Sequence, residues 1–264
     1  MRITKEQLVV LRKRYTESKI IRDSNRLERK QVPSVSDLSG LKKQFQGEDV
    51  HILGSGPSLY GIDWNFFKDK KTICINNTIK YMTVNPSVHV FLDMPVLQEG
   101  GKRHGVPIIT KVGNNVPSNV NEVYKIRCGR ALTNDPMNRG FYSAFSTGHI
   151  AIHLALYFEA KNIYLWGIEK GFLEKNEMIK LSDHMKSSPW YTKDDIIEQD
   201  EKLRQKGFQM GHFYSPDMIH RRDNKPKAYH GAGSKLDPFY TFKNIYQMTP
   251  IHFTKFPYKD IATL

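Results

Sequence analysis

The stretch HILGSGPSLYGID, residues 51–63, decides the fold class of this chain. An apolar run typical of a buried strand passes directly into the turn Gly54-Ser55-Gly56-Pro57-Ser58. Glycines permit tight turns and let a backbone approach a phosphate or ribose, Pro57 fixes the entry into the next turn, and Ser58 can cap it. The N–H groups that follow form an anion site. The third glycine of a dinucleotide-binding fingerprint is absent, so a purely structural turn remains an equal alternative.

Short apolar runs that alternate with helical stretches continue along the chain. This alternation predicts an α/β, Rossmann-like, mostly parallel sheet with helices on both faces. The predicted strands are 50–53, 72–75, 88–92, 108–112, 123–126 and 162–166, and the predicted helix is 148–160. Mixed helical and strand-like signals return at 239–248 and 251–253.

Two further segments accompany this sheet. Residues 1–48 are predicted to form a basic helical arm, because Thr4 opens a capping box and Pro33 ends a thin apolar stripe among arginines and lysines. The arm either braces the core or contacts a phosphate backbone or a membrane surface. Residues 49–264 form the Rossmann-like domain, in which the polar stretch at about 169–228 is predicted to be a lid-like insertion.

Composition and net charge limit the classes of binding partner and the cellular compartment that we expect. The net charge of +13 favours a polyanionic partner such as nucleic acid, with a merely solvated basic face as the alternative. No apolar run approaches the roughly 20 residues that a membrane span needs. The two cysteines, Cys74 and Cys128, cannot build a disulfide framework or a zinc site. We therefore expect a cytoplasmic protein without a transmembrane segment.

Polar residues follow the ends of several predicted strands. In open α/β sheets, ligands bind at the carboxyl ends of the strands, and asparagine side chains can recognise a base or a sugar hydroxyl. These polar positions are Asn76, Asn77, Asp93, Gly167 and Glu169, together with Ser146, Thr147 and Gly148 before the predicted helix. One such position would be an ordinary turn, but several on one edge predict a binding site.

The order of these motifs resembles a known family. GSGPSL, the Asn pair, VFLD, STG and IYLWGIE resemble the bacterial family 42 sialyltransferases that build lipooligosaccharide, and related proteins that share their nucleotide-sugar fold. The resemblance covers about residues 50–95 and 145–169, and 229–253 more loosely. It implies a Rossmann-like domain with a flexible lid, a cytidine nucleotide-sugar donor and no metal.

Carried over by position, the resemblance assigns roles to the polar residues. Gly54, Ser55, Gly56 and Ser58 would hold the nucleotide, Asn76 and Asn77 the donor phosphate or sugar, and Ser146, Thr147 and Gly148 the ribose or base. Glu169 stands where the family has an aspartate, and Asp93 where it has an asparagine. The change at Asp93 suggests another donor sugar, or a carboxylate that serves as the base.

The chain departs from the family at the leaving phosphate and at the general base. The family's two phosphate-binding tyrosines are missing, so Lys170 or the pair Arg221 and Arg222 would neutralise the phosphate. Gly233 replaces the family's histidine before Ser234 and Lys235, and Lys235 is a further phosphate or acceptor contact.

The catalytic base is therefore reassigned. His230 is the nearest histidine and our candidate, because an imidazole titrates near neutrality, and Asp237 is the reserve. A metal bound by His184, His212 or His220 has no ligand spacing behind it.

These observations predict a glycosyltransferase that uses a UDP- or CMP-sugar without a metal or other cofactor. The basic charge favours a hydroxymethylated pyrimidine in DNA as the acceptor, as in phage-type enzymes of the host cytoplasm, and a lipooligosaccharide glycan is the alternative. Two other functions stay open: a nucleotide pyrophosphokinase or hydrolase with Mg²⁺ on Asp93 and Glu169, and a non-catalytic nucleic-acid-binding protein. The resemblance also suggests a homo-oligomer.

Overall fold

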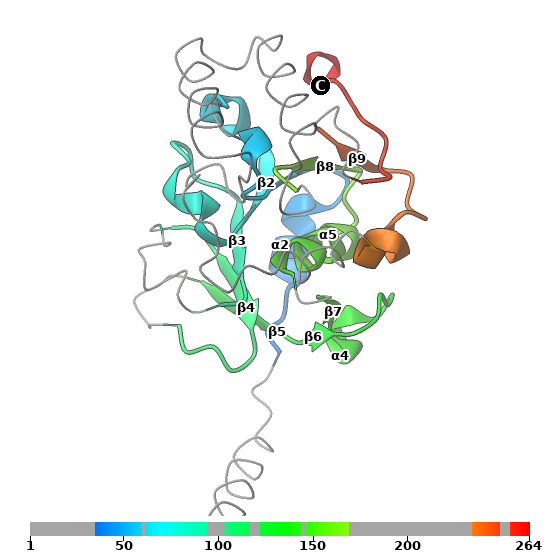
Figure 1. Cartoon of the computed structure of the whole chain (residues 1–264). Coiled ribbons are helices and arrows are strands. Elements are labelled where there is room, and N and C mark those ends of the chain that lie inside the picture. Colours follow the sequence, from blue (N-terminus) through cyan, green and yellow to red (C-terminus); the bar gives the residue numbers. More distant parts are fainter. Residues whose placement is uncertain are drawn as a thin grey trace, which may run out of the picture. The chain divides into compact units, whose positions relative to one another are not determined.

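A computed structural model describes residues 35–59, 62–93, 103, 105–116, 122–143, 146–168, 234–248 and 254–264. Its centre is a seven-stranded sheet in the order β5-β4-β3-β2-β1-β8-β9, and every described strand pair in it is parallel (Figure 1). The strands are β1 Asp49–Leu53, β2 Lys71–Ile75, β3 Val88–Phe91, β4 Ile108–Lys111, β5 Val123–Ile126, β8 Asn162–Trp166 and β9 Ile245–Gln247. The predicted α/β, Rossmann-like parallel sheet is confirmed.

The strand order contains one topological switch point. From β1 the chain proceeds outward on one side through β2, β3, β4 and β5, and it then returns to place β8 against the other side of β1. In doubly wound sheets, the crevice at the carboxyl ends of the two strands that flank this reversal is the usual ligand site. In this chain those strands are β1 and β8, which end at Leu53 and Trp166.

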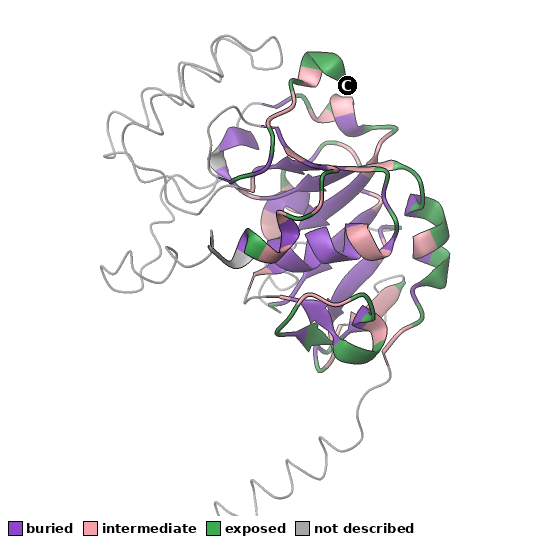
Figure 2. Cartoon of the chain, turned by 90° about the vertical axis from the view of Figure 1, so that its right-hand side faces the viewer, coloured by how far each residue is buried: buried purple, intermediate pink, exposed green. Residues whose placement is uncertain are grey.

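One face of the sheet is aliphatic and lies beneath α-helices. Helix α5, Thr147–Tyr157, is buried over most of its length against the strands (Figure 2). Beside its end lies α2, Ser39–Phe45, whose Phe45 ring stacks on Phe158 with centroids 5.2 Å apart. The strand residues on this face alternate along each strand, as a pleated sheet requires. They include Val50, Ile52, Ile73, Ile75, Val88, Val90, Ile163 and Leu165.

The opposite face is aromatic and partly polar, and among the described residues short 3₁₀ helices cover it. These are η1 Pro57–Leu59, η2 Trp64–Phe67 and η3 Asn76–Lys80. The buried strand residues on this face include His51, Leu53, Thr72, Cys74, His89, Tyr164 and Trp166. Hydrogen bonds satisfy several of the polar groups: Trp166 Nε1 donates to His51 Nδ1 at 3.0 Å, and Ser87 N donates to Thr72 Oγ1 at 3.0 Å.

Residues 35–48, which the sequence assigned to the arm, include part of the core. Leu38, Leu41 and Phe45 are fully buried beneath α5, and Lys42 forms an ion pair with Glu159 at the end of that helix. The chain divides into the units 1–34 and 35–264, so α2 belongs to the larger unit. The remainder of the predicted arm lies outside the described residues.

Both edges of the sheet make backbone contacts outside the strand ladder. At the β5 edge, Ser36 N donates to the Lys125 carbonyl at 2.9 Å and Lys125 N donates to Ser36 Oγ at 2.8 Å. At the β9 edge, Gln247 N donates to the Pro257 carbonyl at 3.0 Å and Lys259 N donates to the Gln247 carbonyl at 3.1 Å. These contacts tie the segments before α2 and after β9 to the two edge strands.

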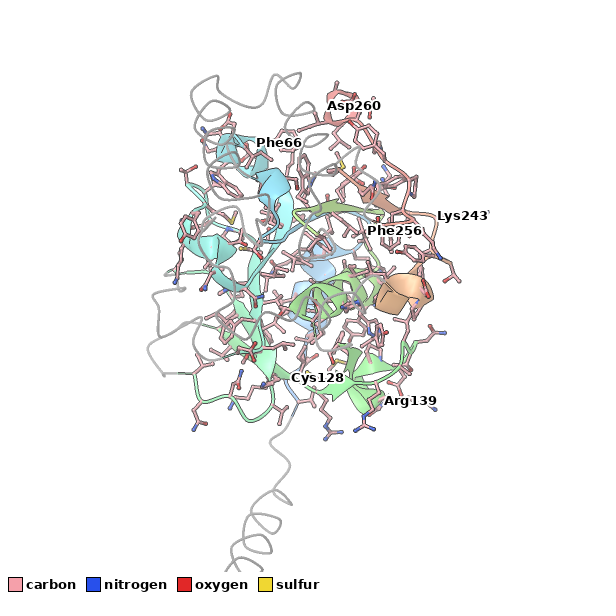
Figure 3. The ribbon with its side chains drawn as sticks, viewed as in Figure 1. Phe66, Cys128, Arg139, Lys243, Phe256 and Asp260 are labelled. Atoms are coloured by element: carbon pink, nitrogen blue, oxygen red, sulfur yellow. The ribbon has the colours of Figure 1, made fainter. Side chains whose placement is uncertain are left out.

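Smaller elements complete the described fold. Strands β6 Cys128–Gly129 and β7 Phe141–Tyr142 form a separate parallel pair around α4 Pro136–Arg139, and η5 Ser234–Phe239 and η6 Ile261–Thr263 lie near the end of the chain. Figure 3 shows Cys128 at this small pair, at the opposite end of the view from Phe66 of η2. Cys74 is buried, Cys128 is exposed, and both are free thiols. None of the described helices has the length and apolar character that crossing a bilayer requires.

Candidate functional site

The glycine loop after β1 lies against the loop after β8 at the switch point. Gly54 N donates to the Trp166 carbonyl at 2.7 Å, and Gly56 N donates to the Gly167 carbonyl at 2.8 Å. A Cβ at Gly54 would lie 2.1 Å from the Gly167 carbonyl oxygen, and Gly167 itself has a φ of 62°. The close approach that Gly54 permits is therefore first of all the approach of these two loops. It draws the carboxyl ends of β1 and β8 together at the crevice.

Asn76 stands at the neighbouring strand end with an unusual backbone. It follows β2 directly and has a φ of 50°, a left-handed conformation that asparagine tolerates better than most residues. Thr147 Oγ1, in the first turn of α5, donates a hydrogen bond to Asn76 Oδ1 at 3.1 Å. Two motifs that lie 71 residues apart in the sequence thus meet at one edge of the sheet, as predicted.

The turns that carry these residues are tied to β1 and to α5. Thr78 Oγ1 in η3 donates to the Gly54 carbonyl at 2.6 Å, which joins the Asn76 segment to the glycine loop. Ser146 caps α5 by accepting a hydrogen bond from Gly148 N at 3.2 Å, as its position before a helix predicted. A Cβ at Gly148 would meet Ile75 and Ile168 side-chain atoms at 3.7–4.0 Å, so the first turn of α5 lies over the ends of β2 and β8.

The other predicted ligand contacts surround this edge. Ser55 is half-buried in the glycine loop, Ser58 is buried in η1, and Asn77 is half-buried in η3. Together with Gly54, Asn76 and Thr147, they place the three predicted binding motifs on the carboxyl edge of β1, β2 and β8. The side chain of Pro57 lies outside the described structure.

Asp93 lies farther along the same edge, beyond β3. Its side chain is 80% exposed, and Lys111 Nζ at the end of β4 approaches its Oδ1 at 3.8 Å. Asn114 is buried and donates through Nδ2 to the Leu92 carbonyl at 2.9 Å and to Thr110 Oγ1 at 2.7 Å. Asn114 thereby fixes the backbone immediately before Asp93. The sequence reasoning missed it, because a single asparagine after a strand looks like a turn residue.

A second group of side chains surrounds the first turn of α5. The Phe239 ring of η5 lies 5.6 Å from that of Tyr142 and 6.2 Å from that of His149. Asp237 in the same 3₁₀ helix forms an ion pair with Lys255 at 3.7 Å. Burial, and to a smaller extent the Asp237 carboxylate, raises the pKa of the Tyr142 hydroxyl above its usual value. The structure thus places Asp237, the reserve base, in an element that packs against the start of α5.

Several predicted site residues lie outside the described part of the chain. His230, Glu169, Lys170, Arg221 and Arg222 lie outside the described residues, as does the predicted lid, and the side chain of Lys235 is likewise outside them. Within the described ranges, no three His, Cys, Asp or Glu side chains lie close enough to hold a metal ion.

Comparison with known proteins gives only remote likenesses. No family model matches the chain, and no curated protein matches it. One similar solved structure is the sialyltransferase CstII from Campylobacter jejuni with cytidine-5′-monophosphate, at 15% identity and a TM-score of 0.31, over 61% of this chain and 77% of that one. Another is a mammalian sialyltransferase with Gal-beta-1-3GalNAc-ortho-nitrophenol, at 13% identity and a TM-score of 0.32, over 69% of this chain and 75% of that one. Likenesses this remote assign no function, which must follow from the site itself.

Proposed function

We propose that this chain is a glycosyltransferase that takes its sugar from a nucleotide-sugar donor. The observation that carries the proposal is the meeting of three motifs at the switch point of the sheet: Gly54–Ser58, Asn76–Asn77 and Ser146–Gly148. Ligands of doubly wound sheets bind at this place, and hydroxyl and amide groups there suit a nucleotide and a sugar. The resemblance of the same motifs to family 42 sialyltransferases adds the class of donor.

The proposed donor lies along the edge from β8 toward β3. Ser146, Thr147 and Gly148 would contact the nucleoside, and the loop 54–58 with Asn76 and Asn77 would contact its phosphate and sugar. The side-chain oxygen of Asn76 already accepts a hydrogen bond from Thr147. The two N–H groups of the same amide can therefore donate to phosphate oxygens. Gly167 and Glu169 would lie at the β8 side of the donor.

The proposed reaction is a displacement at the anomeric carbon. A base removes the proton from the acceptor hydroxyl, the new C–O bond forms, and the bond from the anomeric carbon to the nucleotide phosphate breaks. His230 is the proposed base, with Asp93 and Asp237 as the carboxylates that would replace it. Lys170, Arg221, Arg222 and Lys235 would neutralise the charge that the leaving phosphate gains.

For the acceptor we propose a hydroxymethylated pyrimidine in DNA. The supporting observation is the net charge of +13, which suits a phosphate backbone. A base must leave the helix stack before its hydroxyl can reach a donor, so the acceptor would be single-stranded or flipped.

A donor and acceptor screen tests the proposal. The full chain is incubated with CMP-, UDP- and GDP-sugars, with and without EDTA, and with plain DNA, hydroxymethylated DNA or a lipooligosaccharide glycan. Mass spectrometry then identifies the released nucleotide and the modified acceptor. We expect sugar transfer from one donor to hydroxymethylated DNA, insensitive to EDTA.

The other outcomes discriminate between the alternatives. Transfer to the glycan would keep the transferase and replace the acceptor. Turnover of a nucleotide only with Mg²⁺ would favour a pyrophosphokinase or hydrolase. No turnover with any donor, together with salt-sensitive DNA binding, would overturn the proposal in favour of a binding protein.

A further inference from the structure

His89 is a buried polar residue in β3, whose other residues are apolar. It lies in β3, is fully buried, and pairs in register with Cys74 of β2. Burial lowers the pKa of its imidazole to about 4, so the ring is neutral at physiological pH. Its Nδ1 has no hydrogen-bond partner among the described residues. A buried acceptor without a partner is unfavourable, whereas the other ring nitrogen, Nε2, makes a hydrogen bond.

That interaction joins His89 to the strained residue of the site. His89 Nε2 lies 2.8 Å from the backbone carbonyl oxygen of Asn76. A carbonyl only accepts, so Nε2 carries the proton and donates it. Asn76 is the residue with the φ of 50°, a backbone conformation that persists only where surrounding contacts over-determine it.

Three contacts enforce the conformation of this segment. His89 holds the carbonyl of Asn76 from beneath, Thr147 holds its side-chain oxygen, and Thr78 ties the following turn to Gly54. The contact from His89 acts on the backbone of Asn76. It is also the one that comes from the sheet, whose position is fixed by the strand ladder.

We propose that His89 is a positioning residue of the nucleotide-sugar site: its Nε2–H holds Asn76 in the left-handed conformation that directs the Asn76 amide to the donor. This inference rests on the proposed function. This role requires no contact between His89 itself and the ligand. His89 acts through Asn76: its distal nitrogen reaches the carbonyl while the rest of the ring packs in the core beside Phe91, 5.2 Å away.

Two substitutions separate this role from simple packing. His89→Gln keeps an N–H donor at nearly the reach of Nε2, whereas His89→Met fills a similar volume without any donor. His153→Met is the matched control, because His153 is also buried and its Nε2 bonds to a backbone carbonyl, that of Thr133, at 2.9 Å. His153 contacts β7 and the loop before α4 rather than the Asn76 turn.

Two measurements on the full-length variants test the inference. The first is a crystal structure of each without ligand, in which we expect Asn76 to keep its positive φ in His89→Gln and His153→Met and to lose it in His89→Met. The second is calorimetric titration with CMP and with UDP. For the nucleotide that the parent protein binds, we expect a Kd about five- to tenfold weaker in His89→Met and a change below about twofold in the other two.

The results distinguish a failed inference from a failed function. If Asn76 keeps its conformation in His89→Met, or if this variant binds the nucleotide as tightly as the parent does, the positioning role is wrong whatever the enzyme transfers. Equal weakening by His153→Met would also overturn it, since a general loss of stability would then explain the effect. If the parent protein binds neither nucleotide, the proposed CMP- or UDP-sugar donor is wrong, while the crystal structures still report on the His89 contact.

Discussion

The two faces of the sheet are built in different ways. Beneath α2 and α5, the buried strand residues are Val, Ile and Leu, which make no directional interactions. On the other face, polar side chains make hydrogen bonds: Trp166 of β8 bonds to His51 of β1, and His89 and Thr72 bond to Asn76 and Ser87 outside the strands. A surface of aliphatic side chains supports helices by shape alone. The polar face instead fixes individual turn residues, and the proposed donor site lies among those turns.

This difference predicts that substitutions on the two faces will affect different properties. On the aliphatic face beneath α2 and α5, called the helix face below, substitutions should change the free energy of unfolding and leave ligand affinity unaltered. On the aromatic and polar face beneath the 3₁₀ helices, called the turn face, and in the first turn of α5, smaller losses of stability should accompany changes in ligand affinity. Four experiments, given in order of decreasing expected effect, test this distinction.

The largest effect is expected at the helix face. Phe45→Ala removes a fully buried ring that stacks on Phe158, and it should lower the free energy of unfolding by about 3–5 kcal/mol. Urea denaturation measures the loss, and nucleotide titration of the folded variant should give the parent Kd. A loss below about 1 kcal/mol would show that α2 is not part of the core.

The second-largest effect is expected from acid, which should lower the free energy of unfolding through the buried histidines of the turn face. Burial lowers the pKa of His51 to about 3 and of His89 to about 4, from 6.5 in the unfolded chain. The unfolded chain therefore binds more protons below pH 6.5, and the free energy of unfolding falls as the pH drops, by about 2 kcal/mol per histidine between pH 7 and pH 5. Urea denaturation at the two pH values measures the fall.

His89→Gln supplies the control for this pH effect. It removes one of the titrating groups and should reduce the fall by about 2 kcal/mol. His153, whose pKa burial also lowers, contributes to the remaining fall in parent and variant alike. An unchanged pH dependence in His89→Gln would mean that His89 titrates normally and is not buried as described.

A smaller effect is expected from one hydrogen bond of the turn face. Trp166→Phe removes the indole N–H that donates to His51 and leaves a buried acceptor, which should cost about 1–3 kcal/mol. A double-mutant cycle with His51→Leu isolates the contact, because the loss from Trp166→Phe should shrink when the acceptor is already absent. Additive losses would show that the two rings merely pack.

The smallest effect should appear at the start of α5. Thr147→Val keeps the branched shape but removes the hydroxyl that donates to Asn76, and it should weaken nucleotide binding about threefold with less than about 1 kcal/mol of lost stability. Thr147→Ser keeps the hydroxyl and should bind as the parent does. Equal affinities for the valine and serine variants would remove Thr147 from the site.

The sequence predicted most of the central sheet because its strands are short apolar runs. Val50, Ile52, Ile163 and Leu165 occur at alternate positions in two such runs, and the predicted limits of β1 and β8 agree with the structure to within a residue. Helix α2 was missed, since its core contacts are only Leu38, Leu41 and Phe45 within a polar stretch that reads as part of an arm. Such a helix is stable through tertiary packing, which no local pattern records.

The residues that form the candidate site could be predicted in outline, but the residues that hold them in position could not. Gly54, Asn76 and Thr147 were recognisable because they follow strands or precede a helix. His89 and Asn114 were not, because a histidine within VHVF and an asparagine in a turn acquire a role only from partners 13 and 22 residues away. The sequence predicted that Gly54 lets the backbone approach a phosphate or ribose. In the structure, its missing Cβ makes room for the Gly167 carbonyl.

The contacts at the two edges of the sheet limit how copies of this chain can associate. Lys125 on β5 and Gln247 on β9 have backbone groups that point away from the sheet, and Ser36, Pro257 and Lys259 already bond to them. An exposed edge strand is a template on which another chain can add a strand. At these two positions the backbone groups are already bonded within the chain, which opposes the addition of a strand from another copy there.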